Sequence, residues 1–133
     1  MPKTVLLVGH CGPDSNYLKM IVKKAIGDVT ILSADDSREL FRALEKSQPG
    51  LVLFNRELGF GFDPDSGVEA IRTLRMNYPN LKMMLVSNYL EAQQAAEAAG
   101  ALPGFGKREL GTLRVLQVLR EAVEGGVGVP PMQ

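Results

Sequence analysis

The stretch LVLFN at residues 51–55 consists of four apolar residues followed by an amide, Asn55. Such a short, continuous apolar run is typical of a strand that is buried on both faces of a parallel sheet. The helix breakers Gln48, Pro49 and Gly50 stand directly before it, so we expect the strand to begin at residue 51. Asn55 then lies at the carboxyl end of a buried strand, the end at which open parallel sheets bind their ligands.

Similar apolar runs on both sides of this stretch predict a complete α/β fold. Asp36 with Glu39 and Ser66 with Glu69 form capping-box signatures, which mark the starts of two of the helices between the strands. Five strands that alternate with five helices predict a doubly wound, five-stranded parallel sheet in a three-layer α/β/α arrangement. Besides residues 51–55, strands are predicted at residues 5–8, 29–32, 83–86 and, weakly, 101–105.

The composition is that of one globular domain without a nucleic-acid or membrane partner. The 133 residues are 45% apolar, and 15 basic residues balance 15 acidic ones, so no positive field attracts nucleic acid or an anionic membrane. The apolar run after Lys3 is too short for a signal peptide or a membrane span. A single cysteine, Cys11, cannot form an internal disulfide, so a cytoplasmic location is the simplest expectation. We expect one domain over residues 1–124 and a flexible tail or linker over residues 125–133.

The carboxyl ends of the predicted strands bring together a small set of positions. In a doubly wound sheet the binding crevice lies at these ends, usually beside the first and third strands. The sequence therefore predicts one candidate site. The positions expected to converge there are Gly9, His10, Cys11, Asn55, Ser87 and Lys107.

Several motifs occur together in the order and spacing of a known signalling domain. In these motifs the chain resembles the receiver domain of two-component response regulators, which has the flavodoxin-like fold of the chemotaxis receiver. The resemblance covers about residues 3–123. The motifs are QPGLVLFN at residues 48–55, GVEAIRTLR at 67–75, MLVS at 84–87, AGA at 99–101, and Lys107 six residues further on.

The resemblance implies a role for each converging position. In receiver domains an Asp at the end of the third strand accepts a phosphoryl group, and an acidic pair after the first strand helps to hold Mg²⁺. A Ser or Thr that ends the fourth strand and a Lys that ends the fifth contact the phosphoryl group. Ser87 and Lys107 match these last two roles.

The three carboxylates of the family site are missing together. Asn55 occupies the phosphoacceptor position, and Gly9 and His10 occupy the acidic pair; a shift of the loop by one residue would bring in Cys11 instead of Gly9. An amide is a poor nucleophile and forms no acyl phosphate. With Lys107 cationic and His10 neutral, the pocket changes from a net charge of about −2 to about +1. We therefore expect no Mg²⁺ or other metal, no cofactor and no enzyme activity.

Other departures from the family affect the parts that move on phosphorylation. The residue after the family Lys is usually a cis-proline, and here it is Arg108. The aromatic position that family members use as a rotamer switch aligns with Gly104, and Phe105 would point to the opposite face of the sheet. The loop after the third strand is about four residues longer than usual, which predicts Phe60 and Phe62 over the phosphorylation pocket or in solvent.

The polar positions allow a structural and a functional interpretation. Asn55 either hydrogen-bonds Lys107 and the loop backbone or contacts an anion. Lys107 is either satisfied by Asn55 and nearby carbonyls or is a cation that binds phosphate, sulfate or an acidic partner. Ser87 is either a strand-end cap or an oxyanion ligand.

Weaker alternatives concern the remaining ionisable groups. His10 beside Cys11 suggests a nucleophile with its base or a metal site, but adjacent side chains of an extended chain point in opposite directions. His10 is also a candidate pH sensor near Lys107. Asp63 and Asp65 in the long loop are candidate displaced phosphoacceptors, although they more simply keep the loop soluble and cap the next helix.

The last helix, predicted over residues 109–124, carries more apolar residues than one buried face needs. Its core stripe is expected at Leu110, Leu113, Leu116, Leu119 and Val123. In the receiver family the surface of the last two helices and the fifth strand commonly binds dimer partners and targets. Either the helix is wide and buried in its own core, or it presents an interaction face. The residues of that candidate interaction face are Val115, Val118, Leu119 and Ala122.

These features favour a degenerate receiver, or pseudo-receiver, of two-component-type signalling. It is expected not to be phosphorylated at the family site and to bind a protein partner or a second copy of itself through its last two helices. The first alternative is a sensor of a small anion or acidic metabolite. The second is an ordinary receiver that uses another Asp.

Overall fold

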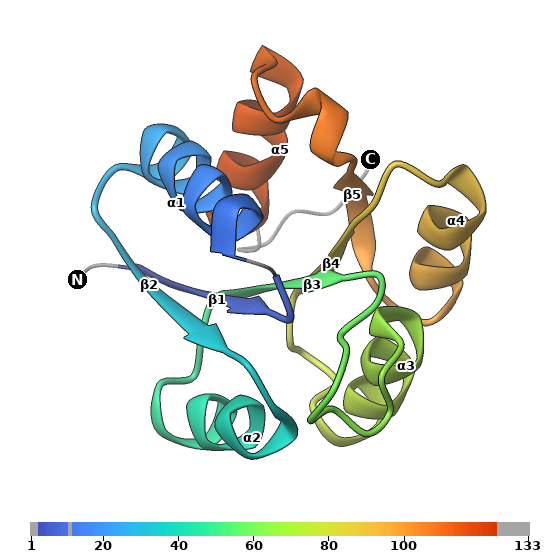
Figure 1. The fold of residues 1–133 in the computed structure, drawn as a ribbon. Coiled ribbons are helices and arrows are strands. Elements are labelled where there is room, and N and C mark those ends of the chain that lie inside the picture. Colours follow the sequence, from blue (N-terminus) through green and yellow to red (C-terminus); the bar gives the residue numbers. More distant parts are fainter. Residues whose placement is uncertain (1–2, 11, 125–133) are drawn as a thin grey trace.

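The five apolar runs form one parallel sheet in the computed structural model, which describes residues 3–10 and 12–124. The strand order is β2-β1-β3-β4-β5, the flavodoxin-like order, with the order reversing between β1 and β3. The predicted fold class is thereby confirmed (Figure 1). The strands are β1 (Lys3–Val8), β2 (Val29–Ala34), β3 (Leu51–Asn55), β4 (Met83–Val86) and β5 (Leu102–Phe105).

Helices cover both faces of the sheet, α1 and α5 on one and α2, α3 and α4 on the other (Figure 1). Both predicted capping boxes supply their N-cap bond: the Asp36 carboxylate accepts from the backbone N–H of Glu39 at 2.8 Å, and the Ser66 hydroxyl accepts from that of Glu69 at 3.3 Å. No helix of the described residues is long and apolar enough to cross a bilayer. The helices are α1 (Gly12–Ile26), α2 (Ser37–Lys46), α3 (Gly67–Asn77), α4 (Leu90–Ala98) and α5 (Leu113–Glu124), and a 3₁₀ turn, η1, spans Lys107–Glu109.

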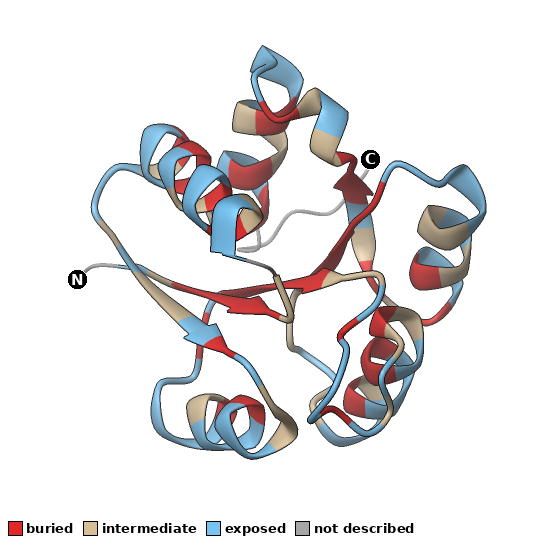
Figure 2. Cartoon of the chain, viewed as in Figure 1, coloured by how far each residue is buried: buried red, intermediate tan, exposed pale blue. Residues whose placement is uncertain are grey.

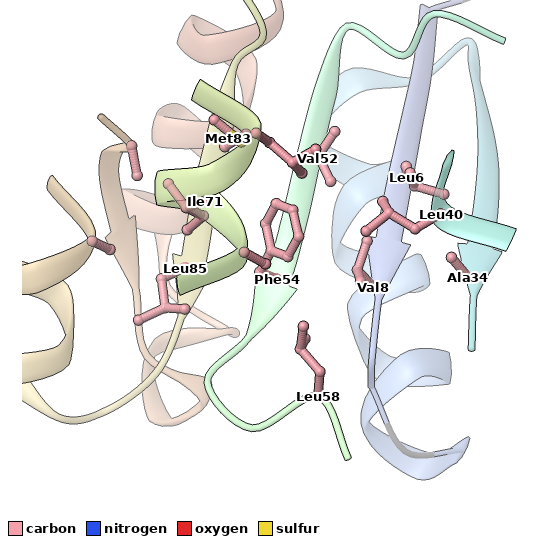
Figure 3. Packing of buried hydrophobic residues seen from close by; sticks show 14 of the residues in the cluster. Leu6, Val8, Ala34, Leu40, Val52, Phe54, Leu58, Ile71, Met83 and Leu85 are labelled. Atoms are coloured by element: carbon pink, nitrogen blue, oxygen red, sulfur yellow. The ribbon is translucent and has the colours of Figure 1, made fainter. Parts of the chain in front are cut away.

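The core lies on both faces of the central strands (Figure 2). Because side chains alternate along a strand, Val52 and Phe54 point to the cluster under α2, α3 and α4, whereas Leu51 and Leu53 point to the cluster under α1 and α5. All four side chains are fully buried, which explains the unbroken apolar run. Figure 3 shows the first cluster, centred on the Phe54 ring.

Most of the long loop at residues 56–65 lies between α2 and α3 (Figure 1), and its start packs at the carboxyl edge of the sheet, where Leu58 meets Gly9. Leu58 and Phe62 are buried and leave a cavity of about 30 Å³ between α2, the loop and α3. The prediction for Phe62 is therefore wrong, because an apolar groove between the two helices was available to it. Phe60 is fully exposed to solvent, which was one of its two predicted positions.

The prediction for the last helix needs two corrections. The helix begins at Leu113, because residues 107–109 form the 3₁₀ turn and Gly111 separates it from α5. Its buried stripe is Val115, Leu119 and Ala122, and these pack in the α1 and α5 cluster, so three of the four residues of the candidate interaction face belong to the core. Val118 is half-buried, and Leu113, predicted in the core, is 82% exposed. Cys11 and the predicted tail at residues 125–133 lie outside the described residues.

Candidate functional site at the carboxyl edge of the sheet

The sheet register brings the predicted site positions to one edge. Val8 pairs with Phe54, Asn55 with Val86, and Val86 with Phe105, so the loops that follow β1, β3, β4 and β5 leave the sheet side by side. The site positions in these loops and strand ends are Gly9, His10, Asn55, Ser87 and Lys107.

The Asn55 amide holds two loops together. Its Nδ2 group donates to the backbone oxygen of Gly9 at 3.2 Å and to that of Glu57 at 2.9 Å. The expected bond to loop backbone is confirmed, but the hydrogen bond predicted between Asn55 and Lys107 is not among those formed, because Lys107 is engaged elsewhere. Asn55 thus acts as a clamp between the loop after β1 and the long loop after β3.

Gly9 has the conformation and the surroundings that only a glycine tolerates. Its φ is +75°, in the left-handed region, and a Cβ placed on it would lie 2.7 Å from Leu58 Cδ2 and 3.0 Å from Leu58 Cα. Figure 3 shows Leu58 directed back toward Phe54 and Val8. The long loop therefore occupies the space that a side chain at position 9 would need.

Lys107 is paired with Asp14, a residue in the first turn of α1. Lys107 Nζ donates to Asp14 Oδ2 at 2.7 Å, and both side chains are somewhat more than one third exposed. The pocket charge of about +1 predicted without Asp14 becomes about zero when this carboxylate is counted. The sequence signal for Asp14 is weak: it is the first carboxyl group after β1, 93 residues before Lys107.

His10 is half-buried, and its ring donates one hydrogen bond to the backbone. Its Nε2 lies 3.0 Å from the Leu53 carbonyl oxygen, and since a carbonyl only accepts, this nitrogen carries the proton. Burial, and secondarily the charge of Lys107, hold the pKa of His10 below its usual value, against opposing effects of the Leu53 hydrogen bond and Asp14. Nδ1 is buried without a hydrogen-bond partner. Cys11, the nucleophile that the sequence places beside His10, lies outside the described residues.

Ser87 is the cap of its own strand end. Its hydroxyl oxygen accepts the backbone N–H of Tyr89 at 3.1 Å, and its own N–H donates to Phe105 O at 2.9 Å. Beside it, the Arg56 guanidinium lies 4.6 Å from the centroid of the Tyr89 ring, which links the loop after β3 to the loop after β4. Ser87 itself is buried.

At Gly104, where the sequence predicts no aromatic switch residue, the surrounding atoms leave no room for a side chain. A Cβ on Gly104 would lie 2.2 Å from the Leu85 carbonyl oxygen and 2.9 Å from Gln93 Oε1. Gln93 Nε2 donates to the carbonyls of Leu85 at 2.9 Å, Ser87 at 3.0 Å and Phe105 at 3.2 Å. The Gln93 amide therefore ties α4 to β4 and β5 at this position, and no sequence motif indicated it.

The donor set of this edge does not fit Mg²⁺. Within residues 3–10 and 12–124, no group of three or more His, Cys, Asp and Glu side chains is placed to hold a metal ion. The pocket carboxylate, Asp14, is bound to a cationic Lys107, whereas Mg²⁺ needs several oxygen ligands in octahedral geometry.

Comparisons with solved structures identify the same fold in receiver domains. A response regulator from Thermotoga maritima matches with a TM-score of 0.70 and 21% identity, over 92% of this chain and 98% of that chain. The beryllofluoride-activated NtrC4 receiver domain dimer matches with a TM-score of 0.72 and 15% identity, over 95% and 99% of the two chains. NtrX from Brucella abortus matches with a TM-score of 0.77 and 19% identity, over 95% of this chain and 28% of that longer chain. The sequence matches no protein-family model and no curated protein.

Proposed function

We propose that this chain is a pseudo-receiver: a receiver-type domain of two-component signalling that is not phosphorylated at Asn55 and acts by binding a protein. The observation that carries the proposal is the amide at the end of β3, whose Nδ2 donates to Gly9 O and Glu57 O. In receiver domains this position holds the carboxylate that accepts the phosphoryl group. Here the side chain has a structural role that a carboxylate could not fill.

The chemistry of the pocket supports the proposal. Phosphoryl transfer to a side chain requires a nucleophilic oxygen and charge stabilisation of the transferred group. An amide supplies no such nucleophile, and the nearby cation, Lys107, is neutralised by Asp14 at 2.7 Å. Asp63 is a poor substitute acceptor, because it lines the cavity between α2 and α3 rather than the sheet edge that carries Lys107.

A small-anion sensor is the second candidate, and the position of Lys107 at the sheet edge favours it. Its weakness is that both polar groups an anion would use are engaged: Lys107 by Asp14, and the Ser87 hydroxyl by the Tyr89 N–H. A bound anion would have to compete with Asp14 for Lys107 and break the hydrogen bond from the Tyr89 N–H to the Ser87 hydroxyl. The pseudo-receiver therefore fits the geometry better.

Intact-mass measurement after incubation with acetyl phosphate and Mg²⁺ tests the proposal. We expect no phosphoryl adduct on this chain, while a receiver domain with an aspartate at the end of β3 gains one under the same conditions. A phosphoryl adduct would overturn the proposal, and its loss in Asp63→Asn or Asp65→Asn would locate the displaced acceptor. A rise in melting temperature with phosphate or sulfate that Lys107→Met abolishes would favour the sensor instead.

A further inference from the structure

The loop at residues 56–65 presents one aromatic side chain entirely to solvent. Phe60 has a relative accessibility of 103%, the largest among the exposed apolar residues, whereas Leu58 and Phe62, two positions before and after it, are buried at 5% and 8%. Single exposed apolar residues are common on protein surfaces and need no explanation by themselves. Phe60 differs because the residues around it are anchored.

Backbone hydrogen bonds fix the loop on both sides of Phe60. Leu58 N–H donates to Asp65 O at 2.8 Å, and Glu57 and Ser66 form an antiparallel bridge, so the two ends of the loop are joined. On the other side, Ser37 N–H donates to Gly61 O at 3.0 Å, which attaches the tip to the start of α2. The ring is thus held out at a defined place, and a partner would bind it without ordering the loop first.

The two glycines that flank Phe60 make this presentation possible. Gly59 and Gly61 have φ values of +86° and +95°, which other residues rarely adopt. A Cβ on Gly61 would lie 3.1 Å from Asp36 Cβ, so the tip passes close to the N-cap of α2. The sequence GFG at residues 59–61 therefore builds a turn whose central side chain projects outward.

The surface around Phe60 is strongly acidic. The two segments that form it, residues 35–39 and 56–65, contain six carboxyl groups and two arginines, a net charge of −4, although the whole chain is neutral. One of the arginines, Arg56, lies over the Tyr89 ring and pairs with Glu57 at 3.3 Å, which leaves the other five carboxyl groups as the main source of the negative charge. The carboxyl groups, here called the acidic rim, are Asp35, Asp36, Glu39, Glu57, Asp63 and Asp65.

We infer that Phe60 and the acidic rim form a docking surface for a protein segment that offers an apolar socket bordered by lysine or arginine. The aromatic ring supplies the buried anchor of such an interface, and the rim supplies electrostatic complementarity and specificity for basic partners. The net charge disfavours an anionic membrane as the occupant. The inference deepens the proposed function, since it relocates the expected interaction surface from α5, whose stripe is core, to the loop after β3.

Peptide selection on the full chain provides the test. A phage-displayed random dodecapeptide library is selected in parallel on the wild-type chain and on Phe60→Ser. Peptides enriched on the wild type alone should combine aliphatic or aromatic residues with Lys or Arg. A synthetic peptide of that consensus should bind Phe60→Ser at least about tenfold more weakly, and should lose affinity as salt is raised.

Matched control variants distinguish specific binding at Phe60 from non-specific binding to exposed apolar side chains. Met76→Ser removes another exposed apolar residue, 81% accessible and on α3, and should leave peptide affinity unchanged. Asp63→Asn combined with Asp65→Asn should reduce the salt dependence. Phe60→Ser should unfold at the wild-type temperature, because its ring is fully accessible.

Three outcomes would overturn the inference. The first is that no peptide is enriched on the wild-type chain relative to Phe60→Ser, and the second is that the consensus peptides lack basic residues. The third is a concentration-dependent dimer of the wild type that Phe60→Ser dissolves, because the occupant would then be a second copy of the chain. Failure of the proposed function has a different readout, a phosphoryl adduct after incubation with acetyl phosphate. The peptide experiment contains no acetyl phosphate, so the two failures can be told apart.

Discussion

Replacing Asn55 by aspartate tests what the amide does at the end of β3. Nδ2 donates two hydrogen bonds, at 3.2 Å to Gly9 O and 2.9 Å to Glu57 O. A carboxylate in the same place donates neither, and each lost bond is worth about 0.5–1.5 kcal/mol. Asn55→Asp should therefore lower the free energy of unfolding by about 1–3 kcal/mol at neutral pH. Repulsion between the carboxylate and the two carbonyl oxygens adds to this loss.

Acid should reduce the destabilisation caused by Asn55→Asp. When protonated, the introduced carboxyl can donate one of the two hydrogen bonds, so the folded chain holds that proton more tightly than the unfolded chain does. The pKa of the introduced carboxyl is then raised in the folded state above its unfolded value of about 3.9. The stabilising effect of the proton is complete below the unfolded pKa and is lost as pH rises through the folded pKa.

Urea unfolding of the wild type, Asn55→Asp and Asn55→Ala at neutral and mildly acidic pH measures both effects. Asn55→Ala loses the same two bonds without adding a charge, so its difference from the wild type should not change with pH. The reasoning is refuted if Asn55→Asp is as stable as the wild type at neutral pH and becomes less stable in acid. That result would mean that Lys107 leaves Asp14 and pairs with the introduced carboxylate.

Two further predictions concern His10 and Gly104. Because burial lowers the pKa of His10, the unfolded imidazole binds a proton below about pH 6.5 that the folded one does not, so stability should fall on acidification through that range. His10→Gln should flatten this part of a urea titration series, and an unchanged slope would contradict the assignment. Gly104→Ala should destabilise the chain by about 1–3 kcal/mol, since its Cβ would lie 2.2 Å from Leu85 O. Gly50→Ala, whose Cβ meets its neighbour at 3.7 Å, should melt near the wild-type temperature; equal losses in both variants would contradict the steric explanation.

The fold was predictable because its signals are local. The apolar run at residues 51–54 is buried on both faces, as is usual for a central strand of a parallel sheet that helices cover on both sides. The helix starts at Asp36 and Ser66 are set by side chains that bond backbone groups three residues away. Signals of this kind come from residues that are close together in the sequence, so they can be recognised without the structure.

The pairing within the site was not predictable to the same degree. Lys107 and Asp14 are 93 residues apart and meet only because α1 starts next to the end of β5. The face of α5 was also misjudged, because two adjacent apolar stripes fit a helical pattern equally well and only packing against α1 selects Val115, Leu119 and Ala122. Both the Lys107–Asp14 pair and the buried face of α5 depend on how the helices and strands pack in three dimensions. Residue types and their spacing do not specify that packing.

Asn55, Gly9 and the long loop form one connected arrangement. Leu58 fills the space above Gly9, so a carboxylate side chain at position 9 would require the loop to move. The loop is in turn held by the bond from Asn55 to Glu57 O, next to Leu58. Asn55→Asp alone therefore leaves position 9 without a carboxylate, and it would loosen the loop that presents Phe60. The contacts at the end of β3 thus also support the loop surface that we propose for partner binding.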